Sequence, residues 1–279
     1  MKLAKIVAHG RVAEALVEAG NVHVVSPWHE GDELNAPFGL PRRVYERDPG
    51  LADVRETLPI SDVAFAAPVD PLSKIMCVGL NYADHVGETA NAMPEFPTIF
   101  QRYADSLVGH DAPVIRPRVS DHYDFEGEIA VVIGKPGRHI PRDAAMGHVL
   151  GLSCFMDGSV RDYQKHSLTA GKNFNRSGAI GPWIVPLDEI GTANPSLQTR
   201  LNGEIVQSTH ADHMIFDIPQ IIEYLSRFFE LRPGDVIATG TPAGVGHRRD
   251  PPLWLKPGNS IAVEVGGVGV LRNDVTAEV

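Results

Sequence analysis

Two glycine-containing dipeptides in the C-terminal half of the chain constrain its fold more than any other feature. Asn202-Gly203 lies within residues Leu197 to Ser208, and Gly266-Gly267 lies within residues Ile261 to Leu271. In both segments apolar and polar residues alternate on either side of the dipeptide, as they do in strands with one buried face. Dipeptides of this kind suit the tight turns of β-hairpins. We therefore predict two antiparallel hairpins.

Other apolar runs are short, which is typical of strands rather than helices. They are Lys74 to Val78, Asp124 to Gly134, Val149 to Met156 and Val236 to Thr239. The run from Asp124 begins with alternation and ends fully apolar, as expected of a strand that enters a core.

One good helix is expected between the two hairpins. Asp217 is placed as its N-cap and Pro219 falls in its first turn. The apolar residues predicted to share one face are Ile218, Ile221, Ile222, Leu225, Phe228 and Phe229. Many hairpins and few helices favour an α+β fold with a mixed, mostly antiparallel sheet that is rolled or barrel-like, rather than alternating βαβ units.

The first 70 residues are predicted to form a separate small α+β domain, which ends near the two prolines Pro68 and Pro71. Ala4 to His9 and Val22 to Val25 are predicted strands, and Val12 to Glu18 is a predicted helix between them. No catalytic cluster falls in this segment, so we expect it to serve packing or dimerisation. Residues 71–279 would then form the catalytic domain.

Charge and composition exclude several classes of function. The 35 Asp and Glu residues outnumber the 25 Lys and Arg residues, giving a net charge of −10 that would repel a polyphosphate backbone. No run approaches the ~20 apolar residues that span a bilayer, and the N-terminus lacks a signal-peptide core. The cysteines, Cys77 and Cys154, lie in apolar runs, as expected of buried, reduced thiols. We expect a cytoplasmic protein that binds neither nucleic acid nor membrane.

Three carboxylates near the middle of the chain form the strongest candidate site. Glu126 and Glu128 are two apart in a predicted strand, so both project from one face. Two like charges held this close require a cation or a proton. An exposed polar strand face is the alternative, but Ala130 and Val132 make the same face apolar further along. Asp157 follows another apolar strand, and three hard oxygen ligands fit Mg²⁺, Mn²⁺ or Ca²⁺ and fit Zn²⁺ poorly.

A histidine and a glutamate lie three residues apart upstream of the carboxylates. On a helical turn His85 and Glu88 share a face, where the carboxylate can orient the imidazole and raise its basicity. A surface pair without catalytic role is the alternative. The neighbouring stretch from Thr89 to Pro97 favours a mobile lid over a packed core.

Taken together, these segments resemble the fumarylacetoacetate hydrolase family from about Lys74 to the C-terminus. Single motifs of this kind are weak, but several in the right order are specific. The motifs are Gly79-Leu80-Asn81-Tyr82-x-x-His85-x-x-Glu88, residues Asp124 to Gly134, residues Asp157 to Gln164, Gly171-Lys172, Asn202-Gly203-Glu204, and residues Pro233 to Pro242.

The resemblance implies a homodimer with a small N-terminal domain and a β-rich catalytic roll. It also implies a divalent cation on Glu126, Glu128 and Asp157, and substrates that are short 2,4-dioxo acids of the acylpyruvate or fumarylpyruvate type from aromatic or sugar-acid catabolism. In such acids the 1-carboxylate and the 2-oxo group would chelate the cation. Cleavage between C3 and C4 would leave an enolate that the metal stabilises.

The resemblance also implies roles for particular side chains. His85, oriented by Glu88, would deprotonate the attacking water, and Tyr82 and Thr241 match substrate-binding positions. The positions that match donors to the developing oxyanion or the substrate are Arg161, Gln164 and Lys172. Arg102 stands where many relatives carry Lys, and we expect its guanidinium to suit a second carboxylate or polar tail of the substrate.

Three functions compete at this point. The leading hypothesis is metal-dependent hydrolysis of a C–C bond in an acylpyruvate-type substrate. The alternative within enzymes is decarboxylation or isomerisation of a 2-oxo diacid on the same metal, which needs no activated water. A catalytically inactive binding protein is the third, and the complete set of ligands and donors argues against it.

Overall fold

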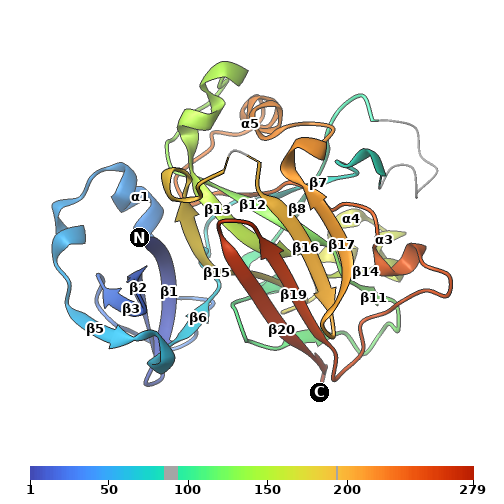
Figure 1. The fold of residues 1–279 in the computed structure, drawn as a ribbon, viewed down its shortest axis with the longest axis horizontal. Helices are drawn as coiled ribbons and strands as arrows, with labels where there is room; N and C mark the ends of the chain where they lie inside the picture. The colour runs from blue at the N-terminus through green and yellow to red at the C-terminus, as the bar shows by residue number, and fades with distance from the viewer. Residues whose placement is uncertain (85–93, 193) are drawn as a thin grey trace.

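The longest sheet of the molecule joins the first 70 residues to the rest of the chain (Figure 1). The computed structural model describes residues 1–84, 94–192 and 194–279. Within them the sheet runs in the order β5 (Glu56–Pro59), β3 (Asn21–Val24), β2 (Arg11–Glu18), β1 (Lys2–Ala8), β15 (Gly178–Pro186), β13 (Val149–Met156), β12 (Gly127–Ile133), β18 (Val236–Ala238), β7 (Ile75–Gly79) and β8 (Thr98–Arg102). Three short strands pair at its margins: β4 (His29–Glu30) with β2, β6 (Ala64–Ala66) with β1, and β9 (Leu107–Val108) with β15.

The N-terminal segment is α+β as predicted, but its helix lies elsewhere. Residues Val12 to Glu18 belong to strand β2, so the predicted helix there is wrong. β2 pairs with β1 on one side and β3 on the other, and Val12 to Val17 are all buried. A segment buried on both faces loses the alternation that marks a strand. The helix of this segment is α1 (Leu40–Tyr45).

Both predicted hairpins are present in a second sheet. Its order is β10 (Val114–Arg116), β20 (Gly269–Ala277), β19 (Ser260–Val265), β16 (Ser196–Leu201) and β17 (Glu204–His210). Asn202 and Gly203 adopt positive φ values of 52° and 89°, as a primed turn requires. The two sheets share one hydrophobic core, to which Ile129, Val131, Leu197 and Val263 contribute. The fold is thus mixed and strand-rich, and the sheets do not close into a barrel.

Helix α5 (Ile218–Ser226) starts where the sequence indicates. The Asp217 carboxylate accepts the backbone N–H of Gln220 at 2.8 Å, and the Gln220 side chain accepts the N–H of Asp217 at 3.0 Å. This capping box satisfies the first turn. The helix ends earlier than predicted, so Phe228 and Phe229 lie beyond it with 54% and 37% of their surface exposed.

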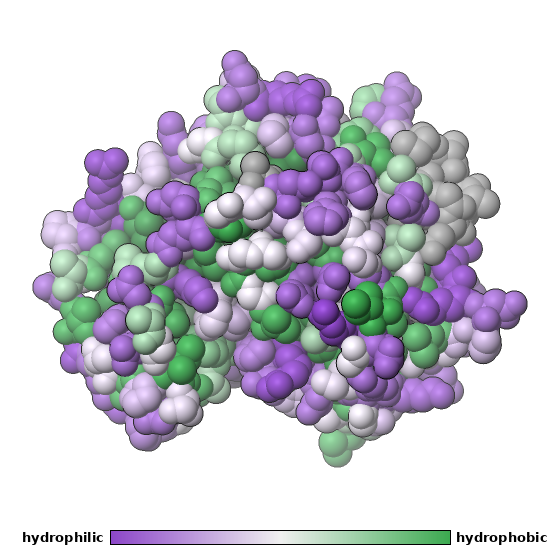
Figure 2. Space-filling model, viewed as in Figure 1, coloured by the Kyte–Doolittle hydropathy of each residue, from purple (hydrophilic) through white to green (hydrophobic). Residues whose placement is uncertain are grey.

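The remaining short elements surround one end of β12 and β13. They are β11 (Tyr123–Asp124), which pairs with β14 (Ser159–Val160), and the helices α3 (Arg161–Gln164) and α4 (Leu168–Lys172). Polar side chains cover most of the face shown in Figure 2, and apolar ones gather in small patches between them. Among the described helices, none has the length and apolar character needed to cross a membrane. Both cysteines are buried and free, as predicted.

Candidate active site

The predicted carboxylate cluster forms at the paired ends of β12 and β13. These strands are antiparallel with Gly127 opposite Met156, so Glu126 and Asp157 lie just beyond the same end of the pair. The backbone N–H of Asp157 donates to the carbonyl of Glu126 at 2.8 Å. Carboxylate oxygens of Glu126, Glu128 and Asp157 all lie within 4.8 Å of one another, and the three residues are buried.

Glu128 differs from the other two because no cation pairs with it among the residues that the structure describes. Its carboxylate accepts the backbone N–H of Gly240 at 2.8 Å. Gly240 has a φ of +102°, and a β-carbon there would lie 2.8 Å from the Cβ of Asn81, so glycine allows this approach. Burial, followed by the charges of Asp157 and Glu126, raises the pKa of Glu128 well above its usual value.

Lys172 supplies positive charge between the other two carboxylates. Its Nζ donates to Glu126 at 2.7 Å and to Asp157 at 2.6 Å, and it lies 5.2 Å from the ring centroid of Phe100. Burial by itself lowers the pKa of the Lys172 ammonium, but Asp157 and Glu126 outweigh burial, and the net shift is upward. The contacts with Glu126 and Asp157 thus favour the charged form of Lys172, which suits an electrostatic role.

Arg102 does not face the cavity. Its guanidinium is fully buried. Its N–H groups donate to Asp157 Oδ1 at 2.5 Å and to the carbonyl of Gly158 at 3.0 Å. They also donate to Ser106 Oγ at 3.1 Å, to the carbonyl of Ser106 at 3.2 Å and to Ser177 Oγ at 3.1 Å. A guanidinium has five N–H donors, so none remains for a second substrate carboxylate. The structure makes Arg102 the positioning partner of Asp157 instead of the substrate contact that we expected.

Arg161 connects the carboxylate cluster to a second anchor, Asp124. Its Nε and Nη2 donate to Asp124 Oδ2 at 2.9 and 2.7 Å, while its Nη1 lies 2.8 Å from Glu126 Oε1 and donates to Gln164 Oε1 at 2.9 Å. Asp124 also accepts from the backbone N–H and Nδ1 of His247, both at 3.1 Å. Burial raises the pKa of Asp124, but Arg161 and His247 outweigh it and hold that pKa below its usual range.

The charges at this site favour a bound cation. The buried carboxylates are Asp124, Glu126, Glu128 and Asp157, and the cationic side chains paired with them are Arg102, Arg161 and Lys172. Four negative charges face three positive ones, and the excess falls on Glu128. Burial and then the neighbouring Asp157 and Glu126 raise the pKa of Glu128, so its carboxylate would be ionised at lower cost with a cation beside it. Oxygen donors of this kind suit a hard divalent cation such as Mg²⁺ or Mn²⁺.

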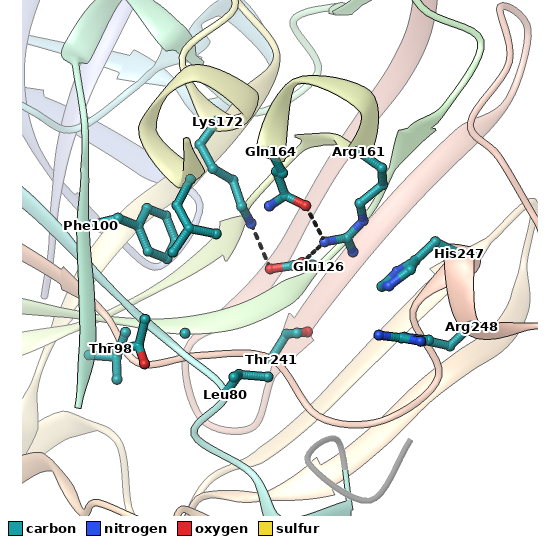
Figure 3. A pocket seen from close by; sticks show the side chains of 13 residues that line it. Leu80, Thr98, Phe100, Glu126, Arg161, Gln164, Lys172, Thr241, His247 and Arg248 are labelled. Carbon is teal, nitrogen blue, oxygen red and sulfur yellow. Dashed lines mark hydrogen bonds and ion pairs between the residues drawn. The ribbon is translucent and has the colours of Figure 1, made fainter. Parts of the chain in front are cut away.

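A cavity of about 260 Å³ opens beside the cluster (Figure 3). Lys172, Gln164 and Arg161 reach towards Glu126 from the short helices α4 and α3 (Figure 3). The residues that line the cavity are Val78, Gly79, Leu80, Thr98, Phe100, Glu126, Arg161, Gln164, Leu168, Lys172, Thr241, His247 and Arg248. Its size suits a small metabolite rather than a large ligand.

Among the residues predicted to bind substrate, Thr241 lines the cavity and Tyr82 and Arg102 do not, whereas the predicted donors Arg161, Gln164 and Lys172 all line it. Thr241 lines the cavity, where its hydroxyl donates to the carbonyl of Gly127 at 2.9 Å and accepts from Gln207 at 2.8 Å. Tyr82 is buried, and its hydroxyl has no hydrogen-bond partner among the described residues. Burial, and then the charge of Glu128, raises the pKa of Tyr82. The predicted pair His85 and Glu88 and most of the predicted lid lie outside the described residues.

Two residues that line the cavity were not predicted from the sequence. His247 and Arg248 belong to the 3-10 helix η7 (Gly246–Arg248) and point into the cavity from the side opposite Phe100 (Figure 3). They directly follow the glycine-rich segment from Gly240 to Gly246. The signal that could have identified them is the basic run that directly follows this segment.

The sequence has clear similarity to known proteins. Residues 74–276 match the family model described as fumarylacetoacetate (FAA) hydrolase C-terminal. The oxaloacetate tautomerase FAHD2A, mitochondrial, of Homo sapiens is 41% identical over 230 residues, which cover 81% of this chain and 73% of that protein.

Solved structures agree over the whole length. A fumarylacetoacetate hydrolase from psychrophilic Exiguobacterium antarcticum superposes with a TM-score of 0.85 at 37% identity and covers 100% of both chains. A 2-hydroxyhepta-2,4-diene-1,7-dioate isomerase from Mycobacterium marinum gives a TM-score of 0.79 at 29% identity, covering 100% of this chain and 99% of its own. With the carboxylate cluster and the ordered motifs, these matches show that the chain belongs to the fumarylacetoacetate hydrolase family.

Proposed function

We propose that this protein is a divalent-metal-dependent enzyme that interconverts the keto and enol forms of a short 2-oxo diacid such as oxaloacetate. The observation that carries the proposal is a small cavity with the three-carboxylate cluster at one side and cationic side chains around it. The relatives named for oxaloacetate tautomerisation and for isomerisation of a dioate support this choice. It reverses the order of the two enzymatic hypotheses that the sequence favoured.

Glu126, Glu128 and Asp157 would hold the cation. When bound, the cation would supply positive charge beside the 1-carboxylate and the 2-oxo group of the substrate. Lys172 and Arg161 add fixed positive charge next to Glu126, where negative charge grows as the substrate loses a proton from C3. The carboxylates around Lys172 favour its charged form, so we assign the role of base to His85, the residue predicted from the sequence.

Hydrolysis of an acylpyruvate-type C–C bond is the second candidate. The 37% identity to a fumarylacetoacetate hydrolase over the full chain favours it. Both reactions place negative charge at the same 2-oxo end of the substrate, so the same donors serve either one. They differ in whether water must be activated, which is the role that the sequence assigns to His85 and Glu88.

A substrate panel separates the two candidates. Oxaloacetate enol decay followed by ultraviolet absorbance, and pyruvate release from acetylpyruvate and fumarylpyruvate, would each be measured with Mg²⁺ or Mn²⁺ and with EDTA. Fast, EDTA-sensitive enol decay without pyruvate release supports the tautomerase. Pyruvate together with a second carboxylic acid supports the hydrolase. Release of CO₂ from oxaloacetate, with neither other activity, would contradict both and indicate a decarboxylase.

We also propose that the chain forms a homodimer, as the family resemblance implies. Size-exclusion chromatography with light scattering would report twice the 30.3 kDa of one chain. A mass of one chain at micromolar concentration would contradict the proposal. The expected cytoplasmic location likewise stays a prediction.

A further inference from the structure

Arg248 occupies an unusual position at the cavity. It points towards the cavity from the side opposite Phe100 (Figure 3), and no ion pair or hydrogen bond is found for its guanidinium among the described residues. The other arginines near the site, Arg102 and Arg161, are fully engaged with Asp157 and with Asp124 and Glu126. Of the two arginines that line the cavity, Arg248 is therefore the one whose guanidinium has no partner among the described residues.

The backbone that carries Arg248 is fixed on both sides. Before it, the N–H groups of Gly246 and His247 donate to Asp124 at 2.8 and 3.1 Å. After it, the Arg249 side chain donates to the carbonyls of Gly244, at 3.2 and 3.0 Å, and of Val206, at 2.6 Å. The backbone of Arg248 is thus anchored, while its side chain is exposed and has no partner among the residues that the structure describes.

The same anchor fixes Arg248 relative to the carboxylate cluster. Asp124 binds both η7 and Arg161, and Arg161 reaches Glu126 at 2.8 Å. At Gly246 a β-carbon would lie 2.5 Å from Asp124 Oδ1 and 1.9 Å from the carbonyl oxygen of Leu253, so this close approach requires glycine. The backbone position of η7 relative to the cluster is thus set by its contacts with buried Asp124.

His247 contributes to the same wall. Its Nδ1 faces the Asp124 carboxylate at 3.1 Å, so Nδ1 carries a proton and the ring orientation is fixed. Val78, Leu80 and Phe100 add apolar surface to the cavity, and Phe100 lies on the side opposite His247 (Figure 3). A ligand in this cavity therefore meets the Glu126 carboxylate, apolar side chains such as Phe100, and the Arg248 guanidinium on the side opposite Phe100 (Figure 3).

We infer that Arg248, supported by His247, binds the second carboxylate of the substrate and makes the protein select 2-oxo diacids over 2-oxo monoacids. This inference rests on the proposed function, because it assumes that the 2-oxo end lies at the carboxylate cluster. A guanidinium binds a carboxylate through two parallel N–H donors, so it recognises geometry as well as charge. This role replaces the one that the sequence assigned to Arg102.

The test compares binding of two 2-oxo acids that differ in the second carboxylate. Isothermal titration calorimetry in Mg²⁺ would measure 2-oxoglutarate and pyruvate on the wild type, on Arg248→Gln and on Arg248→Lys. We expect the wild type to prefer 2-oxoglutarate. We expect Arg248→Gln to lose about tenfold in affinity for it, the scale of one charge-assisted hydrogen bond on an accessible side chain, and to keep its affinity for pyruvate. Arg248→Lys should lie between, because it keeps the charge without the fork.

The matched control is Arg227→Gln, which removes the same charge from the exposed pair with Glu223 at the end of α5. It should bind both acids as the wild type does. If the wild type binds both acids equally, or if Arg248→Gln weakens both equally, the inference is overturned while the proposed function stands. If neither acid binds in Mg²⁺, both the inference and the proposed function fail. Unchanged thermal unfolding of Arg248→Gln would show that the fold is intact.

Discussion

Replacing Glu128 with Gln should make the metal-free protein more stable and remove its response to metal. The Glu128 carboxylate is buried and has no cation paired with it among the described residues, so its ionisation in the metal-free state is unfavourable, as its raised pKa indicates. In the wild type the backbone N–H of Gly240 donates to the Glu128 carboxylate at 2.8 Å. Glutamine has the same shape, and its amide oxygen can accept the same hydrogen bond. The variant therefore loses an unfavourable buried charge in the metal-free state.

The effect of metal on the wild type can be worked out in the same terms. A cation that binds the folded state alone adds about 2.7 kcal/mol to the free energy of unfolding at 100 times its Kd. For a chain of this size that raises Tm by about 5 °C. In Glu128→Gln one of the three ligands is neutral, so we expect a rise of less than about 1 °C at the same Mg²⁺ concentration.

The assay is differential scanning calorimetry with EDTA and with a series of Mg²⁺ and Mn²⁺ concentrations. Glu264→Gln is the matched control, because that carboxylate pairs with Arg200 at the surface, and its metal response should equal that of the wild type. A Glu128→Gln variant with the full metal response would refute the assignment of Glu128 as a ligand. A variant that is less stable than the wild type in EDTA would refute the argument from the uncompensated charge.

Further measurements test the rest of the site. The folded-state pKa of Glu128 is raised, so the folded protein is favoured when this side chain is protonated. This contribution to the free energy of unfolding is fully present below the unfolded-state pKa of roughly 4.3. It is lost as the pH rises through the folded-state pKa. In guanidinium chloride denaturation with EDTA, the free energy of unfolding of Glu128→Gln should thus increase relative to that of the wild type as the pH rises. A difference that does not change with pH would contradict this. His85→Ala should keep the calorimetric metal response and turn over roughly 10²- to 10⁴-fold more slowly, and wild-type turnover would show that His85 is not the base. Arg102→Met leaves Lys172 as the remaining cation beside Asp157. We expect it to lower the free energy of unfolding by about 3–5 kcal/mol and Tm by about 6–10 °C. A decrease in Tm of less than about 1 °C would show that the buried pair does not hold Asp157 in place.

The elements that the sequence predicted correctly are those whose signals are local. Asn202-Gly203 favours its turn by backbone conformation alone, and Asp217 caps its helix with atoms three residues away. The carboxylates Glu126, Glu128 and Asp157 could also be identified, because they stand at the ends of apolar strands and strand ends of one sheet meet at its edge. For the same reason the sequence could identify these carboxylates as a candidate site for a divalent cation.

Other features depend on contacts between distant segments. Residues Val12 to Glu18 have a composition that a helix accepts, and only the pairing of β2 with both β1 and β3 makes them a strand. The direction in which Arg102 points is likewise set by partners up to 75 residues away. Helix propensity and residue type are weak preferences that such tertiary contacts override.

The sequence by itself thus determined the family, the hairpins and the chemical nature of the metal site, because these depend on residue types at short spacing. The tertiary structure decided which arginine side chain faces the cavity and which one is buried in ion pairs and hydrogen bonds that hold Asp157 in place. Arg102 and Arg248 carry the same group, but one is buried with every donor paired and the other has its donors available beside an anchored backbone. The difference arises because a guanidinium that is enclosed by acceptors cannot also bind a ligand, and only the fold brings those acceptors together.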